Sequence, residues 1–114
     1  MPKIIITGGL GFIFSHVTEY FVKKGWNVYV LDNQSVGSHP EIIDGSFTFY
    51  KVDVEHSMHA FLAINPDYII HAAAISDVDY SIVNAKDTIQ KNCAATLTVF
   101  EAARQCTNLK KLLY

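Results

Sequence analysis

Two glycines, Gly8 and Gly11, stand three residues apart in the stretch TGGLGFIFSH, residues 7 to 16, which overlaps the end of the apolar run KIIIT. Between a strand and a helix, glycines at this spacing permit a tight turn and let the backbone come close to a pyrophosphate. The amides of Phe12 and Ile13, at the start of the helix, would then face an anion beyond the strand. The pattern predicts a dinucleotide-binding turn, and a tight turn without a ligand is the alternative.

Phe14 stands at the third position of this turn, where a small residue lets the helix approach the strand or the ligand closely. An added phenyl ring must fill the crevice, move the helix outward or enter the core, and overpacking of this size costs about 1–3 kcal/mol. A ring that swings aside and stacks near the ligand is a further alternative. We expect Phe14 to weaken the contacts with the phosphates.

Two carboxylates follow the next apolar runs. Asp32 ends the run WNVYVLD, 21 positions after Gly11, where a carboxylate can accept hydrogen bonds from an adenosine ribose. The residues from Asp32 onward, DNQSVG, contain no arginine or lysine, so a 2′-phosphate would be repelled and NAD is favoured over NADP. Asp53 ends the run SFTFYKVD and could reach the adenine edge. A solvated surface acid is the alternative at both positions.

A scaffold must bring the ends of these strands together. Apolar runs bounded by glycine or polar residues predict strands, and apolar residues at helical spacing, such as Ile13, Val17 and Phe21, predict helices. The expected strands cover residues 3–7, 26–32, 46–53, 66–74 and 110–114, and the expected helices cover residues 12–24, 57–65 and 86–106. Because strands and helices alternate, we expect an α/β fold with a doubly wound parallel sheet in the order 3-2-1-4-5. Residues 46–53 alternate more and are expected near the sheet edge.

The composition narrows the function classes. A chain of 114 residues with 50% hydrophobic and 18% charged residues predicts one globular domain. A net charge of -2 without a basic block gives no support for binding to nucleic acid or a membrane surface. No apolar run has the length of a membrane span or a secretion signal, so we expect a cytoplasmic protein. Cys93 and Cys106 lack the spacing of metal ligands and are expected to be buried thiols.

Several motifs, in the same order along the chain, resemble those of one family. TGGLGFIFSH resembles the TGGxGFIGSH turn of the extended short-chain dehydrogenase/reductases, the NAD-dependent nucleotide-sugar epimerases and dehydratases. LDNQSVG (31–37) resembles the LDN-hydroxyl-G segment of that family, and VDV (52–54) its GDV or GDI. HAAAISDVDYSI (71–82) is similar to the HLAAESHVDRSI segment of 4,6-dehydratases, and NCAATLTVFEAAR (92–104) to the NVxGTxNLLEAAR helix. The resemblance covers essentially the whole chain and implies an NAD-binding, Rossmann-like domain over residues 1–114.

The resemblance also implies a set of NAD contacts, which comprises a phosphate turn, two acidic strand ends and a floor of small residues. The pyrophosphate would lie at Gly8, Gly11, Phe12 and Ile13, the ribose at Asp32 and Asn33, the adenine at Asp53 and Val54, and the floor at Ala72, Ala73 and Ala74, steadied from the long helix by Asn92. Ser76, Asp77 and Val78 would begin the sugar-nucleotide site. His71 is expected to be a packed residue with satisfied ring nitrogens rather than a catalyst.

The catalytic Tyr-x-x-x-Lys pair of that family, with its Ser/Thr partner, would follow the fifth strand, beyond Tyr114. Tyr20 and Lys24 have the same spacing, but they lie at the far end of the first helix and are expected to be ordinary surface residues. Ala95 replaces a glycine of the long helix, which is a mild change.

We therefore expect an N-terminal fragment without the catalytic segment and the substrate domain, and no turnover by this chain alone. The parent enzyme would oxidise a nucleotide-bound hexose at C4 and return the hydride after epimerisation or dehydration. The alternative is a non-catalytic Rossmann module whose crevice is blocked by Phe14 and which serves binding or assembly. A last strand left as an edge predicts self-association, most simply as a symmetric dimer.

Overall fold

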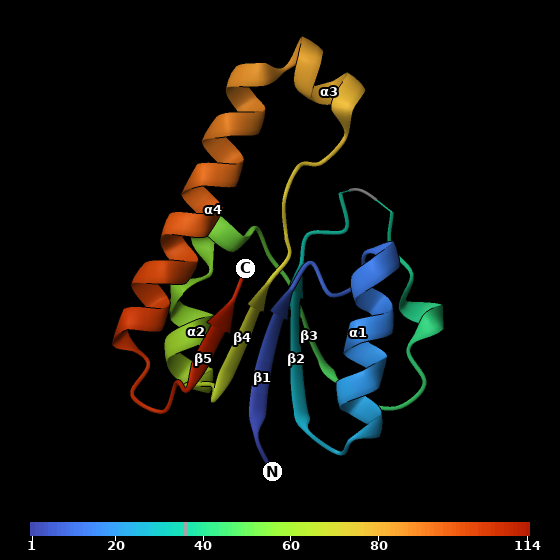
Figure 1. Ribbon diagram of the computed structural model, residues 1–114, viewed down its shortest axis with the longest axis vertical. Helices are drawn as coiled ribbons and strands as arrows, with labels where there is room; N and C mark the ends of the chain where they lie inside the picture. Colours follow the sequence, from blue (N-terminus) through green and yellow to red (C-terminus); the bar gives the residue numbers. More distant parts are fainter. Residues whose placement is uncertain (36) are drawn as a thin grey trace.

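Five parallel strands form one sheet in the order β3-β2-β1-β4-β5 (Figure 1). The computed structural model describes residues 1–35 and 37–114, so Val36, within the LDNQSVG segment, lies outside the described residues. The strands are β1 (Lys3–Thr7), β2 (Asn27–Asp32), β3 (Thr48–Lys51), β4 (Tyr68–His71) and β5 (Lys111–Leu113). The helices are α1 (Phe12–Lys23), α2 (Met58–Ile64), α3 (Val78–Val83) and α4 (Ala85–Gln105), with short 3-10 turns η1 (Pro40–Ile42) and η2 (Val54–His56). The predicted doubly wound α/β fold and its strand order are confirmed.

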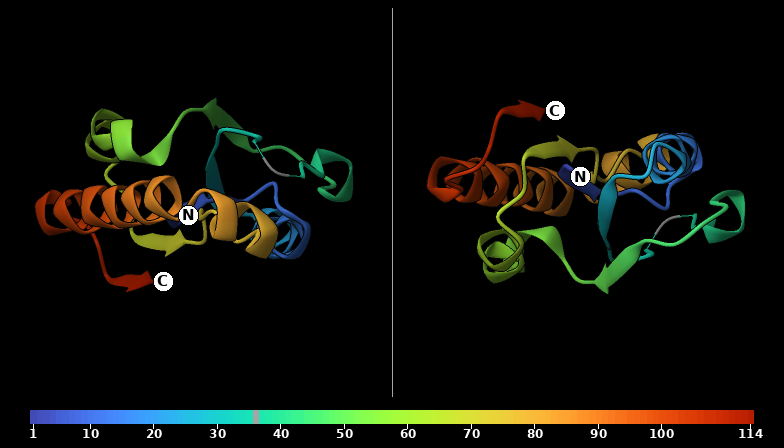
Figure 2. Two further views of the ribbon diagram at one scale, coloured as in Figure 1. Left: turned by 90° about the horizontal axis from the view of Figure 1, so that it is seen from above. Right: turned by 90° about the horizontal axis from the view of Figure 1, so that it is seen from below.

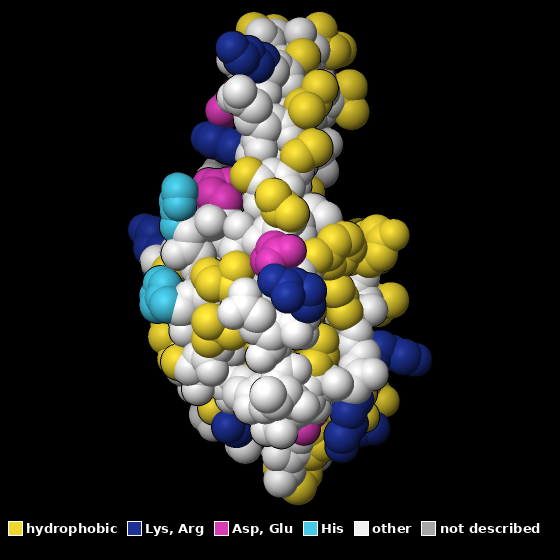
Figure 3. Space-filling view, turned by 90° about the vertical axis from the view of Figure 1, so that its left-hand side faces the viewer, with side chains coloured by type: hydrophobic (Ala, Val, Ile, Leu, Met, Phe, Trp, Pro, Cys, Tyr) yellow, Lys and Arg dark blue, Asp and Glu magenta, His cyan; other side chains and the backbone are white. Residues whose placement is uncertain are grey.

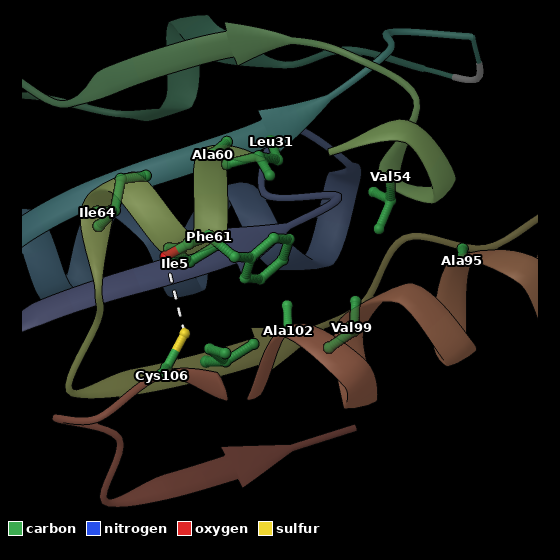
Figure 4. Packing of buried hydrophobic residues seen from close by; sticks show 11 residues of the cluster. Ile5, Leu31, Val54, Ala60, Phe61, Ile64, Ala95, Val99, Ala102 and Cys106 are labelled. Carbon is green, nitrogen blue, oxygen red and sulfur yellow. Dashed lines mark hydrogen bonds between the residues drawn. The ribbon is translucent and has the colours of Figure 1, made fainter. Parts of the chain in front are cut away.

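The sheet is buried on both faces because neighbouring residues of a strand point to opposite sides. Ile5 packs in a cluster with side chains of α2 and α4, whereas Ile4 and Ile6 pack on the side of α1. Phe61 of α2 is fully buried, and Figure 4 shows its ring among side chains of the sheet and α4. In both views of Figure 2, α2 lies beside the C-terminal part of α4, and α1 lies apart from them. Apolar burial on two faces thus fixes the helices and leaves the carboxyl ends of the strands at one edge.

Helix α1 packs closely on the sheet through two small groups. The Thr18 hydroxyl donates a hydrogen bond of 2.9 Å to the carbonyl oxygen of Gly9. A Cβ atom on Gly9 would lie 2.8 Å from that hydroxyl oxygen and 3.0 Å from a methyl group of Val30. The buried residues of α1 are Ser15 and Thr18, and Ile13 is 67% exposed. The closest part of this contact is therefore formed by hydroxyl-bearing residues, and Ile13 stays on the exposed face of α1.

Three local expectations need correction. Strand β4 ends at His71 rather than at residue 74: the Ala72 amide still reaches the Thr7 carbonyl oxygen, but it shares its proton with the Thr7 side-chain oxygen, and the Ala73 amide turns to that side chain. Strand β3 is shorter than expected, although it is an edge strand as predicted. Cys93 is exposed on α4, and only Cys106 is buried as expected. Burial raises the pKa of the Cys106 thiol.

Helix α4 is longer than the sheet that it covers. Its 21 residues span about 31 Å at 1.5 Å per residue, so its first turns and α3 project beyond the carboxyl ends of the strands (Figure 1). Apolar side chains gather along this projection (Figure 3) and include the exposed residues Val78, Ile82, Val83 and Ile89. Helix α3 was not predicted. None of the helices in the described part of the chain is long and apolar enough to cross a membrane.

Candidate functional site

A cavity of about 700 Å³ lies at the carboxyl ends of the strands. Its walls come from the turn after β1, the ends of β2 and β3, the segment after β4 and the inner face of α4. All twelve residues predicted for the cofactor site line it: Gly8, Gly11, Phe12, Ile13, Asp32, Asn33, Asp53, Val54, Ala72, Ala73, Ala74 and Asn92. Ser76 and Asp77 line it as well, whereas Val78 is not among its lining residues. The fold thus brings all twelve predicted residues to one cavity.

The two predicted glycines of the turn have different physical roles. Gly8 has φ +69°, and a Cβ atom there would lie 2.8 Å from the backbone nitrogen of Ala73, so the fold itself requires glycine. Gly11 has an ordinary φ of -64°, and its Cβ would meet only the carbonyl oxygen of Gly8, at 3.4 Å. The backbone therefore does not require glycine at position 11. The absence of a side chain there instead leaves open space at the cavity, through which a ligand can approach the backbone.

The start of α1 faces the cavity without a neutralising side chain. Gly11 is the N-cap residue, no side chain caps the helix, and its first turn holds no acidic residue. The first amides of a helix lack partners within the helix and carry a partial positive charge. Phe12 and Ile13, which carry two of these amides, line the cavity. This arrangement suits a phosphate group, which would accept the free amide protons.

Asp32 is held in place by two backbone amides, one of them in the glycine turn before α1. Its two carboxylate oxygens accept hydrogen bonds from the amides of Leu10, at 3.2 Å, and Gln34, at 2.8 Å. Gln34 has φ +59°, which is uncommon outside glycine, and its amide closes a turn with the Asp32 carboxylate. Each oxygen keeps a lone pair for a further donor, such as a ribose hydroxyl. Lys51 is the register partner of Asp32 on β3, but it is not among the residues that line the cavity.

Two other predicted residues join the ends of β2 and β3. The Asn33 side-chain amide donates a hydrogen bond of 2.8 Å to a carboxylate oxygen of Asp53. The Asn33 side-chain oxygen accepts the amide proton of Ser35 at 2.9 Å. Val54 is buried at the start of η2, directly after Asp53. These contacts fix the wall at which the adenosine is expected.

The floor of the cavity is tied down by Asn92 on α4. The Asn92 side chain accepts the amide proton of Ile75 at 2.7 Å and donates to the Ile75 carbonyl oxygen at 3.1 Å. This double hydrogen bond replaces the strand partner that Ile75 lacks after the end of β4. Asn92 therefore steadies the segment after β4, as the sequence predicted.

His71 joins three elements beside this floor. Its Nδ1 lies 2.7 Å from the Thr7 hydroxyl oxygen at the end of β1, and its Nε2 lies 3.2 Å from the Thr96 hydroxyl oxygen on α4. Burial lowers its pKa below the ordinary value of 6.5. The expectation of a packed histidine with both ring nitrogens satisfied is confirmed. Thr7 and Thr96 were missed as partners, since nothing in the sequence showed which group would face each hydroxyl.

Phe14 is half-buried and lies between the hydrophobic core and the cavity. It packs against the cluster of Ile4, Ile6 and Leu10 on the α1 side of the sheet, and it also lines the cavity. Helix α1 nevertheless keeps its close contact with the sheet, because the approach is made through Gly9 and Thr18. Phe14 therefore lies between the core and the cavity, beside a helix that packs closely on the sheet.

Two tyrosines have lysine neighbours on helices. Tyr20 and Lys24 approach within 3.4 Å on the exposed surface at the end of α1 opposite the cavity, as expected for ordinary surface residues. Tyr80, which sequence reasoning did not single out, lines the cavity and donates a hydrogen bond to Asp87, which also pairs with Lys91. That hydrogen bond raises the pKa of Tyr80, so the hydroxyl keeps its proton at neutral pH.

The contrast between the two glycines predicts different effects of alanine on stability. Gly8→Ala should lower the free energy of unfolding by at least about 1–2 kcal/mol, because alanine resists a positive φ and its Cβ would contact Ala73. Gly11→Ala should change it by less than about 0.5 kcal/mol, because φ and space both allow alanine there. Urea unfolding followed by circular dichroism measures both. Equal losses for the two variants would show that Gly11 is also needed by the fold.

Comparison with known proteins agrees with this geometry. Residues 4–114 match the NAD dependent epimerase/dehydratase family. The chain is 35% identical over 111 residues to a probable dTDP-glucose 4,6-dehydratase of Sinorhizobium fredii, covering 90% of this chain and 32% of that protein. It is 34% identical over 113 residues to a dTDP-glucose 4,6-dehydratase of Neisseria meningitidis, covering 91% of this chain and 32% of that protein.

Solved structures agree as well. The UDP-glucose 4-epimerase of Thermotoga maritima, solved with UDP-glucose, superposes with a TM-score of 0.88 at 30% identity, covering 96% of this chain and 36% of that one. The Thermus thermophilus enzyme, in complex with NAD, gives a TM-score of 0.85 at 32% identity, with 96% and 36% covered. The chain thus spans about a third of the length of these relatives. With the match over residues 4–114, the chain belongs to the NAD dependent epimerase/dehydratase family.

Proposed function

We propose that this chain is the NAD-binding part of a nucleotide-sugar epimerase or dehydratase. The observation that carries the proposal is the cavity in which an uncapped helix start and a fixed carboxylate, Asp32, face the same space. In the full-length protein, bound NAD would accept a hydride from C4 of the hexose and return it later. The residues of this chain would bind and orient the dinucleotide: the start of α1 at the pyrophosphate, Asp32 and Asn33 at the ribose, and Asp53 and Val54 at the adenine.

The residues present fit an uncharged 2′-hydroxyl better than a 2′-phosphate. The open space at Gly11 admits a pyrophosphate next to the first amides of α1. Around the proposed ribose position the lining residues include three carboxylates, Asp32, Asp53 and Glu55. Lys91, the lysine among the lining residues, is paired with Asp87 on α4. A 2′-phosphate would therefore add negative charge to an already acidic wall.

The role of Asp32 can be tested by comparing NAD with NADP. NAD should bind more tightly than NADP, and Asp32→Ala should weaken NAD binding about tenfold while affecting NADP less, because the acceptor of the ribose hydroxyls is lost. Asp79→Ala, which removes the same charge from α3 outside the cavity, should leave both affinities unchanged. Calorimetry, with NMR titration for weak binding, measures the affinities of the three proteins for both dinucleotides. NADP binding as tight as NAD by the unmodified chain would contradict the proposal.

Phe14 is proposed to weaken the binding of NAD. Its ring lines the cavity and carries no group that could bind a phosphate. We expect the unmodified chain to bind NAD weakly or not at all, and Phe14→Gly to strengthen binding at least about tenfold, which corresponds to about 1.4 kcal/mol. Glycine in a helix and the lost packing will lower the stability of the variant, so urea unfolding must first show that it is folded.

The outcome of this comparison separates two functions. Tighter binding by Phe14→Gly supports a cofactor site that the phenyl ring restricts. Micromolar affinity in the unmodified chain, unchanged by Phe14→Gly, would show that the ring swings aside. A folded chain and a folded variant that both fail to bind NAD would favour the alternative, a non-catalytic module for binding or assembly.

We also propose that the chain associates with itself, most simply as a symmetric dimer. Strand β5 pairs only with β4 within the described sheet, and apolar side chains such as Ile89 and Leu97, each 63% exposed, lie on α4. Light scattering should give a mass that rises with concentration. Leu97→Glu should lower the association, and Leu62→Glu on α2 serves as a matched control. A monomer at all concentrations would contradict this proposal.

A further inference from the structure

The Thr7 hydroxyl group lies at the centre of a hydrogen-bond network under the cavity. Its oxygen accepts the amide proton of Ala73 at 3.1 Å and that of Ala72 at 3.0 Å, which Ala72 shares with the Thr7 carbonyl oxygen, 3.1 Å away. A hydroxyl oxygen has two lone pairs and one proton. With both lone pairs engaged by amides, the hydroxyl proton is left for the third neighbour, Nδ1 of His71, at 2.7 Å.

This accounting fixes the protonation state of His71. Nδ1 can accept the Thr7 proton only if it carries no proton itself, so the ring must be neutral with its proton on Nε2. Nε2 then donates to the Thr96 hydroxyl oxygen on α4, 3.2 Å away. A proton on Nδ1 would face the Thr7 oxygen as a third donor, with no lone pair to receive it. The network therefore favours the neutral ring with its proton on Nε2.

The same network positions the floor of the cavity against the glycine turn. The backbone nitrogen and Cα of Ala73 lie 2.8 and 2.9 Å from the place that a Cβ of Gly8 would occupy. A shift of Ala72 and Ala73 would therefore change the packing against Gly8, in the turn beside the proposed pyrophosphate position. Asn92 holds the next part of the floor through Ile75, one helical turn before Thr96 on α4.

We propose that His71 is a positioning residue for the dinucleotide site: its neutral Nε2–H form orients the Thr7 hydroxyl, which fixes Ala72 and Ala73 against Gly8, and protonation of Nδ1 releases this floor and weakens dinucleotide binding. The binding part of this inference rests on the proposed function. The burial that lowers the pKa of His71 keeps the ring in the required form at neutral pH.

Among the described residues, no charged side chain is paired with the His71 ring. The polar groups that contact it are the hydroxyls of Thr7 on β1 and Thr96 on α4, and within the described residues no carboxylate is paired with it. The titratable and charged side chains that line the cavity are Asp32, His39, Asp53, Glu55, Asp77, Tyr80 and Lys91, and α4, β5 and the residue after β5 add Lys86, Asp87, Cys93, Glu101, Arg104, Lys111 and Tyr114. Among the described residues none of these side chains is hydrogen-bonded to His71, although their charges act on it at a distance.

The sign of the pH effect follows from the lowered pKa. As the pH falls through about 6.5, the unfolded chain takes up a proton at His71 before the folded chain does. The contribution of the neutral ring to stability is therefore complete above about pH 6.5 and is lost as the pH falls toward the lower folded pKa. The intact floor is expected above the ordinary histidine pKa and its release below the lowered pKa of His71, so the two states are compared at about pH 7.5 and at an acidic pH of about 5.

The first measurement needs no cofactor. In the free chain labelled with nitrogen-15, NMR at about pH 7.5 should show an unprotonated Nδ1 and a protonated Nε2 for His71. Hydrogen exchange should show protected amides at Ala72 and Ala73, and, after correction for the intrinsic effect of pH, a protection lower by about fivefold or more at about pH 5. A proton on Nδ1 at neutral pH, or protection that does not change, would overturn the proposal.

The second measurement compares NAD affinity at the two pH values in matched variants. The unmodified chain, or Phe14→Gly if its binding is too weak, should bind NAD about fivefold or more weakly at about pH 5. His71→Asn offers an oxygen near the position of Nδ1 without titrating, so it should keep the affinity and lose the pH dependence. His71→Leu should bind weakly at both pH values, and His59→Asn, on the exposed surface of α2, should keep the full pH dependence. A pH dependence that survives in His71→Asn would overturn the proposal.

The two measurements separate this inference from the proposed function. One outcome is that His71 has its proton on Nε2 and the protection of Ala72 and Ala73 depends on pH, but NAD does not bind at either pH. This outcome supports the positioning role and counts against NAD as the ligand. The other outcome is that NAD binds equally at both pH values and the protection of Ala72 and Ala73 does not change. This outcome supports NAD as the cofactor and overturns the role of His71.

Discussion

The backbone contact between Gly8 and Ala73 is the constraint on which the cavity depends. Strand β1 lies at the centre of the sheet, with β2 on one side and β4 on the other, so the chain leaves β1 and β4 at the same edge. The two exits can pass each other only if one of them lacks a side chain, since a Cβ on Gly8 would lie 2.8 Å from the Ala73 nitrogen. The positive φ of Gly8 then turns the chain toward α1 and opens the space between the turn and the floor.

Helices α1 and α4 complete the cavity from opposite faces of the sheet. Gly9 and Thr18 hold α1 close enough for its first amides to line the space, even with a phenylalanine at position 14. Helix α4 supplies Thr96, which contacts His71 at the end of β4, and Asn92, which holds Ile75 in the segment after β4. The central apolar contacts, among them Ile5, Phe61 and Val99, keep α4 in that position. Packing of the core thus sets the geometry of polar groups at the edge.

Local sequence patterns were sufficient for the fold, and the resemblance of several motifs to one family gave the residues that line the cavity. Alternating apolar runs and helical spacings determine the parallel sheet, and its carboxyl edge collects the residues that end each strand. Partner choice among polar groups was not predictable in the same way. The sequence does not show which groups the Thr7 hydroxyl contacts. In the structure β4 ends at His71, and the Thr7 side-chain oxygen accepts hydrogen bonds from the next two amides, those of Ala72 and Ala73. Helix α3 was missed because its residues Val78–Val83 bury no apolar face, although Asp77 caps it through the Tyr80 amide.

An NMR titration of the chain with NAD tests the central claim most directly, because it locates even weak binding. The account predicts that the amide signals of Gly11, Phe12 and Ile13, and those of the floor from Ala72 to Ile75, shift together with increasing NAD. Signals around the second hollow, lined by Val22, Trp26 and Phe47 at the other end of the sheet, should stay in place. Shifts confined to that second hollow, or no shifts in the folded chain and in folded Phe14→Gly at millimolar NAD, would contradict the account.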